Sequence, residues 1–97
     1  MSAVVRDYEI TVITRPNLEI DAANTEIKSI LAAHDANITD ENSMGRRHLN
    51  YERNHHQAGL YFYYKFQMTP AKTHALQTDL NIKTDILQYM IKNPARR

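Results

Sequence analysis

The sequence predicts an α+β domain in which a four-stranded antiparallel sheet carries two helices on one face. Four segments alternate apolar and polar side chains, as strands do, and two others carry apolar residues at helical spacing. Each helical segment lies between two strand segments, so the predicted order is β-α-β-β-α-β. The length of 97 residues suits a single domain over 1–97, with a core fold at about 7–92 and a short basic tail at 93–97.

The first strand is predicted at residues 7–14, where DYEITVIT alternates before Pro16 breaks the pattern. Its expected core-facing side chains are Tyr8, Ile10, Val12 and Thr14. A helix should follow from about Asp21, whose carboxylate can cap the first turn. Its apolar stripe consists of Ile20, Ala23, Ile27, Ile30, Leu31 and His34. We expect His34 to be partly buried at the edge of the stripe and not to bind a ligand.

A long hairpin is predicted next. Its first strand should run from about Ala36 to Arg53, with Gly45 marking a bulge or kink. The turn is expected at 54–59, closed by Gly59. In the second strand, the side chains expected to face the core are Leu60, Phe62, Tyr64, Phe66 and Met68, and those expected on the other face are Tyr61, Tyr63, Lys65 and Gln67. Leu49 and Tyr51 are also predicted to be mainly core.

Thr69 and Pro70 predict the start of a second helix, because a hydroxyl can cap its first turn and proline suits its first position. The predicted buried stripe is Ala71, Ala75, Leu76 and Leu80, and the helix should end near Asn81. The last strand is predicted at 86–92 with Leu87, Tyr89 and Ile91 facing the core. This order of elements is the ferredoxin-like βαββαβ fold, which leaves one face of the sheet open.

Several classes of function are excluded or disfavoured. The chain has no cysteine, which rules out disulfides and thiolate metal sites. It contains only two glycines, too few for a phosphate-binding glycine loop, and no apolar run long enough to span a membrane. The arginine after the first strand, Arg15, is followed by Pro16 and carboxylates, which disfavours an acylphosphatase site. We therefore expect no enzyme, no cofactor, no metal site and no small-molecule substrate, and an intracellular protein without a membrane partner.

Charge is distributed unevenly along a chain whose net charge is only +1. Residues 1–41 hold three basic and eight acidic side chains, a balance of −5, whereas residues 42–78 hold five basic and one acidic, a balance of +4. A basic surface on a weakly charged body favours a polyanionic partner. The alternative is an ordinary distribution of solvated charges.

The basic segment also contains the candidate binding residues. These are Arg46, Arg47, Arg53, His55, His56, Tyr61, Tyr63 and Lys65. Basic side chains neutralise phosphates, and aromatic rings on an open sheet can stack on unpaired bases, so the set predicts RNA binding. Tyrosines are also common in protein interfaces. The alternative is a protein-interaction or small-ligand regulatory module that dimerises through its open sheet face.

The chain resembles the bacterial-type small-subunit ribosomal protein six family. The matching stretches are DYEITVI with Pro16-Asn17-Leu18, Gly45-Arg46-Arg47-x-Leu49-x-Tyr51, Gly59-x-Tyr61 leading into YYKFQM, and ILQYMIK. The resemblance implies a non-enzymatic component of the small subunit, in the cytoplasm or an organelle. It also implies binding to the central domain of small-subunit rRNA together with small-subunit ribosomal protein eighteen. The chain departs from the family pattern at Glu52, Arg53 and Gln88.

Overall fold

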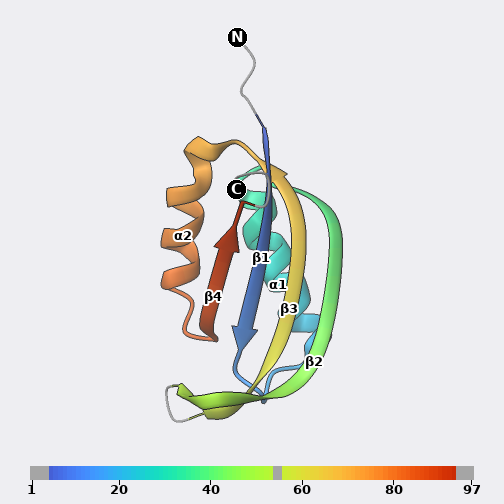
Figure 1. The fold of residues 1–97 in the computed structure, drawn as a ribbon, viewed down its shortest axis with the longest axis vertical. Coiled ribbons are helices and arrows are strands. Elements are labelled where there is room, and N and C mark those ends of the chain that lie inside the picture. Colours follow the sequence, from blue (N-terminus) through green and yellow to red (C-terminus); the bar gives the residue numbers. More distant parts are fainter. Residues whose placement is uncertain (1–4, 54–55, 94–97) are drawn as a thin grey trace.

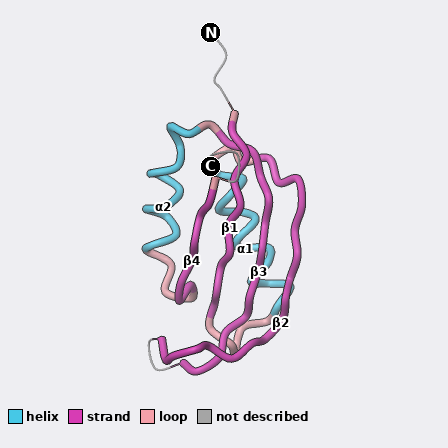
Figure 2. The backbone as a smooth tube through the Cα atoms, in the orientation of Figure 1, coloured by secondary structure: helices cyan, strands magenta, loops and turns pink. Residues whose placement is uncertain are grey.

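The computed structural model describes the backbone of residues 5–53 and 56–93 and the side chains of 5–47 and 58–93 (Figure 1). The elements are β1 (Arg6–Thr14), α1 (Ile20–Ala33), β2 (Asn37–Arg53), β3 (His56–Met68), a 3-10 turn (Pro70–Lys72), α2 (Thr73–Asn81) and β4 (Ile86–Lys92). The strands form one antiparallel sheet in the order β2-β3-β1-β4. Helix α1 lies behind β1 and β3, and α2 lies beside β4 (Figures 1 and 2). Both helices pack against the same core-facing side chains of the sheet, so neither covers its other face. The predicted ferredoxin-like fold is confirmed.

The core lies between the helices and the alternate side chains of the two inner strands. Strand β1 contributes Tyr8, Ile10, Val12 and Thr14, and β3 contributes Leu60, Phe62, Tyr64, Phe66 and Met68, all buried. These are the side chains that the alternation predicted. The helices add Ala23, Ile27, Ile30, Leu31, Leu76 and Leu80. Burial of each large apolar side chain contributes roughly 1.5–3 kcal/mol, so this layer provides most of the stability of the fold.

The start of α1 differs from the prediction. The N-cap residue is Glu19, with no side-chain capping hydrogen bond, and Asp21 lies inside the first turn. There its carboxylate can still favour the positive end of the helix dipole. Ile20 is 41% exposed and does not belong to the buried stripe, which begins at Ala23.

The predicted position of His34 is confirmed, and it has a partner that the sequence pattern did not indicate. It follows α1 as the C-cap residue, and its side chain is 14% exposed. The imidazole Nε2 lies 2.6 Å from Oδ2 of Asp79 in α2. This contact joins the end of the first helix to the second helix.

The hairpin is longer and its turn shorter than predicted. Strand β3 begins at His56, and Gly59 is a buried strand residue opposite Arg47 rather than the end of the turn. A glycine keeps both of its backbone hydrogen-bonding groups and can therefore belong to a ladder as well as to a turn. Gly45 does mark the predicted bulge: its φ is +78°, and the β2–β3 register shifts between Ser43 and Gly45.

The second helix begins with the 3-10 turn after Thr69, whose hydroxyl makes no capping hydrogen bond. The predicted end at Asn81 is confirmed. Leu76 and Leu80 are buried, but Ala71 and Ala75 are exposed, so half of the predicted stripe is wrong. Ala71 lies in the 3-10 turn, which rotates the residues before Thr73 relative to the α-helical phase. Ala75 lies within α2, on a side of the helix that faces away from the core.

Strand β4 has the predicted bounds, and Tyr89 and Ile91 pack against the core as predicted. In place of Leu87, the third residue to do so is Ile86. A register shift between Ile13 and Thr14 pairs Thr14 with Ile86 and leaves Leu87 between two paired positions. The alternation is therefore interrupted at the start of β4.

Candidate nucleic-acid interface

The open face of the sheet is organised in rows of residues that lie opposite one another on neighbouring strands. Residues directly opposite in an antiparallel pair share a face, so the register defines these rows. Three of these rows extend across all four strands: Asn42, Tyr63, Thr11 and Met90; Asp40, Lys65, Glu9 and Lys92; and Gly45, Tyr61, Ile13 and Gln88. The prediction that Tyr61, Tyr63 and Lys65 lie on the open face of an inner strand is confirmed.

The row around Lys65 is mixed in charge. Lys65 is exposed and lies opposite Glu9 on β1 and Asp40 on β2, while Lys92 on β4 lies opposite Glu9. The expectation of an aromatic and basic face therefore needs correction here, because the neighbouring strands bring carboxylates to the same row. The alternation of residues 7–14 already places Glu9 on the face of the strand that points away from the core. The carboxylate on the open face could therefore have been predicted from the sequence.

Tyr63 lies next to these carboxylates and is half-buried. Its burial, followed by the negative charge of Glu9 and a hydrogen bond to the Glu9 carboxylate, raises the pKa of the Tyr63 phenol above its ordinary value, and Asp40 adds to the effect. The phenol is therefore neutral at physiological pH. It can offer a polar hydroxyl or an uncharged ring to a partner, but not a negative charge.

Tyr61 has open space on one side. Its neighbour on β2 is Gly45, and a Cβ atom placed there would meet nothing within 4 Å. Its neighbour on β1 is Ile13, an apolar side chain that is only 8% exposed. A half-buried ring beside an apolar floor and an open glycine position is a platform on which a flat ligand group can stack.

Arg46 and Arg47 lie beyond the bulge at the hairpin end of β2, and both are exposed. They do not share a face of the sheet. Arg46 is opposite the core residue Leu60, on the helix side, whereas Arg47 is opposite Gly59, on the open side. The Nε–H of Arg47 donates to the carbonyl oxygen of Met44 at 3.2 Å.

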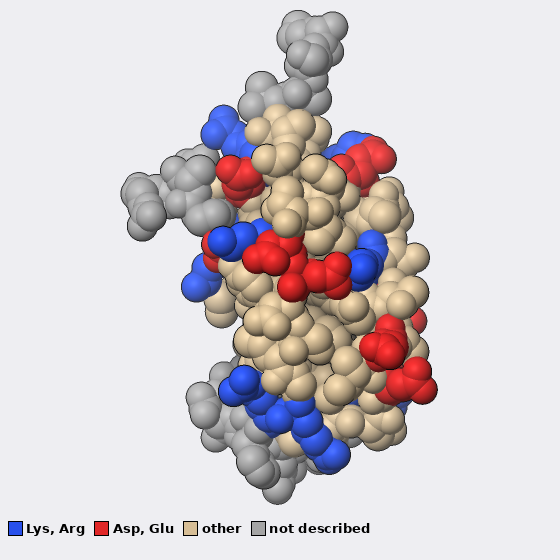
Figure 3. All heavy atoms as spheres, turned by 90° about the vertical axis from the view of Figure 1, so that its right-hand side faces the viewer, with Lys and Arg blue, Asp and Glu red and all other residues tan. Residues whose placement is uncertain are grey.

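Neither of these arginines forms an ion pair with a described residue, unlike several other cations of the chain. Arg15 pairs with Asp85 at 2.5 Å, Lys28 with Glu41 at 3.0 Å, and Lys72 pairs with Asp35. In the side view of Figure 3, the largest group of Lys and Arg atoms lies at the lower end, beside the residues drawn in grey. Asp and Glu atoms lie above this group. In this view the basic group at the lower end is therefore separate from the acidic side chains, whereas higher up Lys and Arg atoms lie among Asp and Glu atoms.

The remaining predicted binding residues are Arg53, His55 and His56. The backbone places Arg53 opposite His56 at the end of the hairpin. His55 and the side chains of Arg53 and His56 lie outside the described residues, as do the side chains of Leu49 and Tyr51 and the basic tail from Pro94.

Other kinds of site find little support in the described part of the chain. Among the residues 5–47 and 58–93, no three His, Asp or Glu side chains are grouped as metal ligands. No helix that the structure describes is both long enough and apolar enough to cross a lipid bilayer.

Comparison with known proteins identifies the relatives of this chain. A family model described as Ribosomal protein S6 matches residues 7–93. Small ribosomal subunit protein bS6 of Desulforamulus reducens is 31% identical over 90 residues, covering 90% of this chain and 95% of that protein. The bS6 protein of Dehalococcoides mccartyi is 28% identical over 92 residues, covering 92% and 84%. The crystal structure of 30S ribosomal protein S6 from Thermotoga maritima superposes with a TM-score of 0.82 at 20% identity, covering 92% and 87%.

Proposed function

The chain belongs to the ribosomal protein S6 family, and from this premise we propose that it binds the central domain of small-subunit rRNA together with small-subunit ribosomal protein eighteen. Family membership makes the chain a structural component of the small ribosomal subunit, located on the ribosome in the cytoplasm. We propose further that it acts without catalysis, as part of a ribonucleoprotein.

One observation carries the RNA contact: Arg46 and Arg47 are exposed at the hairpin end without a described acidic partner. Guanidinium groups in this state can neutralise phosphates and release condensed counterions, which is the main source of affinity for RNA. Because the two side chains leave opposite faces of β2, they can contact phosphates on both sides of the strand. Tyr61 adds a ring on the open side for an unstacked base.

The row around Lys65 suits a protein partner better than RNA. Glu9 and Asp40 would repel phosphates, whereas alternating charges on a sheet can pair with a complementary protein surface. We therefore assign the hairpin end to RNA and the rest of the open face to the partner protein.

A binding titration against a central-domain rRNA fragment, with and without the partner protein, tests this assignment. The double variant Arg46→Ala/Arg47→Ala should weaken binding and lower the slope of log affinity against log salt by roughly 1.5–2, because about two phosphate contacts are lost. The matched control is Lys28→Ala/Lys83→Ala, which removes the same charge from the helix side. Equal losses for the two double variants, or an affinity insensitive to salt, would contradict the proposal.

A second candidate function is dimerisation through the open face. Met90 favours it, because this apolar side chain is 51% exposed in the same row as Tyr63. Sedimentation velocity without RNA distinguishes the two functions: a stable homodimer that Met90→Ser dissociates would support self-association. An acylphosphatase reaction is disfavoured further by the pairing of Arg15 with Asp85, and an acyl-phosphate hydrolysis assay should show no turnover.

A further inference from the structure

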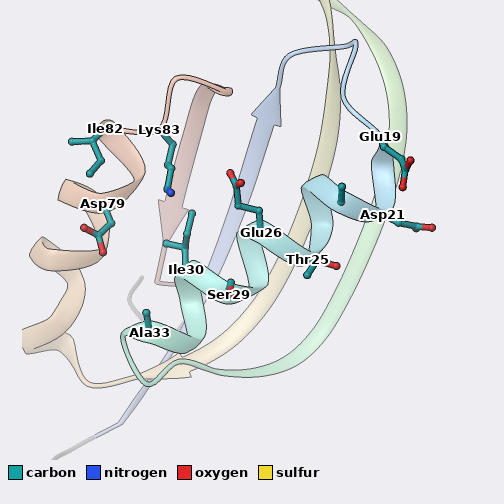
Figure 4. A pocket seen from close by; sticks show the side chains of 11 residues that line it. Glu19, Asp21, Thr25, Glu26, Ser29, Ile30, Ala33, Asp79, Ile82 and Lys83 are labelled. Carbon is teal, nitrogen blue, oxygen red and sulfur yellow. The ribbon is translucent and has the colours of Figure 1, made fainter.

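A groove of about 890 Å³ runs between α1 and α2, on the side of the molecule away from the open sheet face (Figure 4). Residues of α1 form one wall, and residues at the C-terminal end of α2 form the other. Ile30, which belongs to the core, lies between the two walls. The groove is therefore built from the same two helices that cover the sheet, and it uses none of the proposed RNA-binding residues.

The described lining of this groove is acidic. Its charged residues are the carboxylates of Glu19, Asp21, Glu26 and Asp79 and a single ammonium group, that of Lys83. Asp79 already has His34 as its partner. The other three carboxylates are exposed and form no ion pair with a described residue. Negative charge concentrated along one wall attracts a cationic ligand.

The same groove also offers apolar contact. Ile82 at the end of α2 is 69% exposed, which is the highest exposure among the large apolar side chains that the structure describes. It lines the groove together with Ile30, and Ala33 contributes a small apolar side chain at the other end. An exposed isoleucine beside a buried one can hold an apolar side chain of a ligand and remove both from water.

We propose that this groove binds a cationic amphipathic segment of another protein. Lysine or arginine side chains of the segment pair with the carboxylates of α1, and an apolar side chain packs between Ile30 and Ile82. Helix α1 has 14 residues and is thus about 21 Å long, enough to align several turns of a partner helix. Nucleic acid is disfavoured in the same place, because its phosphates would meet carboxylates.

A synthetic lysine–leucine peptide with about four amphipathic helical turns is a suitable probe. It is titrated into the full chain while the chemical shifts of the backbone amides are followed. We expect saturable binding that weakens with salt and shifts confined to α1 and α2. A peptide of the same composition with a scrambled pattern should bind more weakly, because it cannot present its leucines on one side.

Paired variants make the test specific. Glu26→Gln should weaken peptide binding by up to about fivefold, the range for one exposed ion pair, and Ile82→Ser by roughly tenfold. The matched controls on the open sheet face are Asp7→Asn, which removes the same charge, and Met90→Ser, which removes an exposed apolar side chain. Both controls should bind the peptide as the natural chain does.

Three outcomes would overturn the proposal: amide shifts on the sheet face, equal losses in the groove variants and the controls, or no saturable binding. Salt-sensitive self-association without peptide, abolished by Glu26→Gln, would also overturn it and assign the groove to a second copy of the chain. The rRNA titration of Glu26→Gln and Ile82→Ser should be unchanged. The rRNA titration therefore tests the proposed RNA-binding residues, and the peptide titration tests the groove, so either proposal can fail without the other.

Discussion

The two faces of β3 differ in what their polar groups contact. On the helix side, the hydroxyl of Tyr64 donates to Oδ1 of Asn24, and the amide of Asn24 donates to Glu41 at 3.3 Å. Lys28 of α1 donates to the same carboxylate at 3.0 Å. These polar groups hold α1 against the edge of the sheet.

On the open side, alternate residues of the same strand have no such helix above them. Tyr61 and Tyr63 are half-buried and Lys65 is exposed. The comparison indicates that the residues of β3 on the helix side stabilise the fold, whereas the alternate residues on the open side are available to bind partners. Substitutions on the helix side should change the free energy of unfolding, whereas those on the open side should change affinity for partners.

The largest effect should come from the buried ring of Phe62. Phe62→Ala is expected to lower the free energy of unfolding by about 3–5 kcal/mol, because it removes apolar contact and leaves a cavity. Urea denaturation followed by circular dichroism measures it. The neighbouring substitution Tyr61→Ala should cost about 1 kcal/mol or less. Similar costs for the two would contradict the division between the faces.

Tyr61→Ala should instead reduce affinity for the rRNA fragment. The expected loss is about 1–3 kcal/mol of binding free energy, the range for one base stacked on an aromatic ring. Tyr61→Phe keeps the ring and should bind nearly as the natural chain does. Filter binding at fixed salt compares the three proteins. An equal loss in both variants would show that the hydroxyl, rather than stacking, makes the contact.

Tyr64 should produce a smaller effect that depends on pH. Burial, followed by the negative charge of Glu41, raises the pKa of the Tyr64 phenol well above its ordinary value of 10.0. Above about pH 10 the unfolded chain releases this proton while the folded chain retains it, so the free energy of unfolding should fall as pH rises.

The variant Tyr64→Phe should lose this part of the alkaline decline and cost about 1 kcal/mol at neutral pH, from the hydrogen bond to Asn24. Urea denaturation at several pH values between neutral and strongly alkaline conditions measures both quantities. An unchanged alkaline slope in Tyr64→Phe would contradict the assignment of this decline to Tyr64.

The smallest effect is expected at Glu41. The hydrogen bond from Lys28, followed by that from Asn24, lowers the pKa of the Glu41 carboxyl. Its stabilising contribution is therefore present above the ordinary pKa and is lost as pH falls through the lowered value. Because the pair is solvent-exposed, Glu41→Gln should cost about 0.5 kcal/mol or less. Thermal unfolding at neutral and acidic pH measures it, with Glu26→Gln as the control.

The sequence predicted the fold and the division of β3 well, because both depend on alternation. Tyr8 to Thr14 and Leu60 to Met68 keep a period of two over complete strands, and a buried face permits no slip of register. The bounds of β4 were equally clear, because Asn93 and Pro94 end an apolar run. The resemblance to the family agreed with this order of elements.

Positions that depend on contacts between distant elements were not predictable in the same way. Leu87 lies opposite a register shift that arises between β1 and β4, and no feature of ILQYMIK alone indicates it. The pairing of His34 with Asp79 joins residues 45 positions apart. Local pattern also favoured a turn at Gly59, because glycine is common in turns, although the ladder continues through it.

The bulge at Gly45 acts as a change of phase between the two halves of β2. Met44 is the additional residue on β2. Each side chain after it therefore lies on the opposite face of the sheet from the one it would have in a regular strand. If β2 were regular here and Met44 were paired with Tyr61, Arg46 would lie opposite Gly59 and Arg47 would lie opposite Ala58. The bulge thus determines which of the two guanidinium groups lies on the open face with Tyr61.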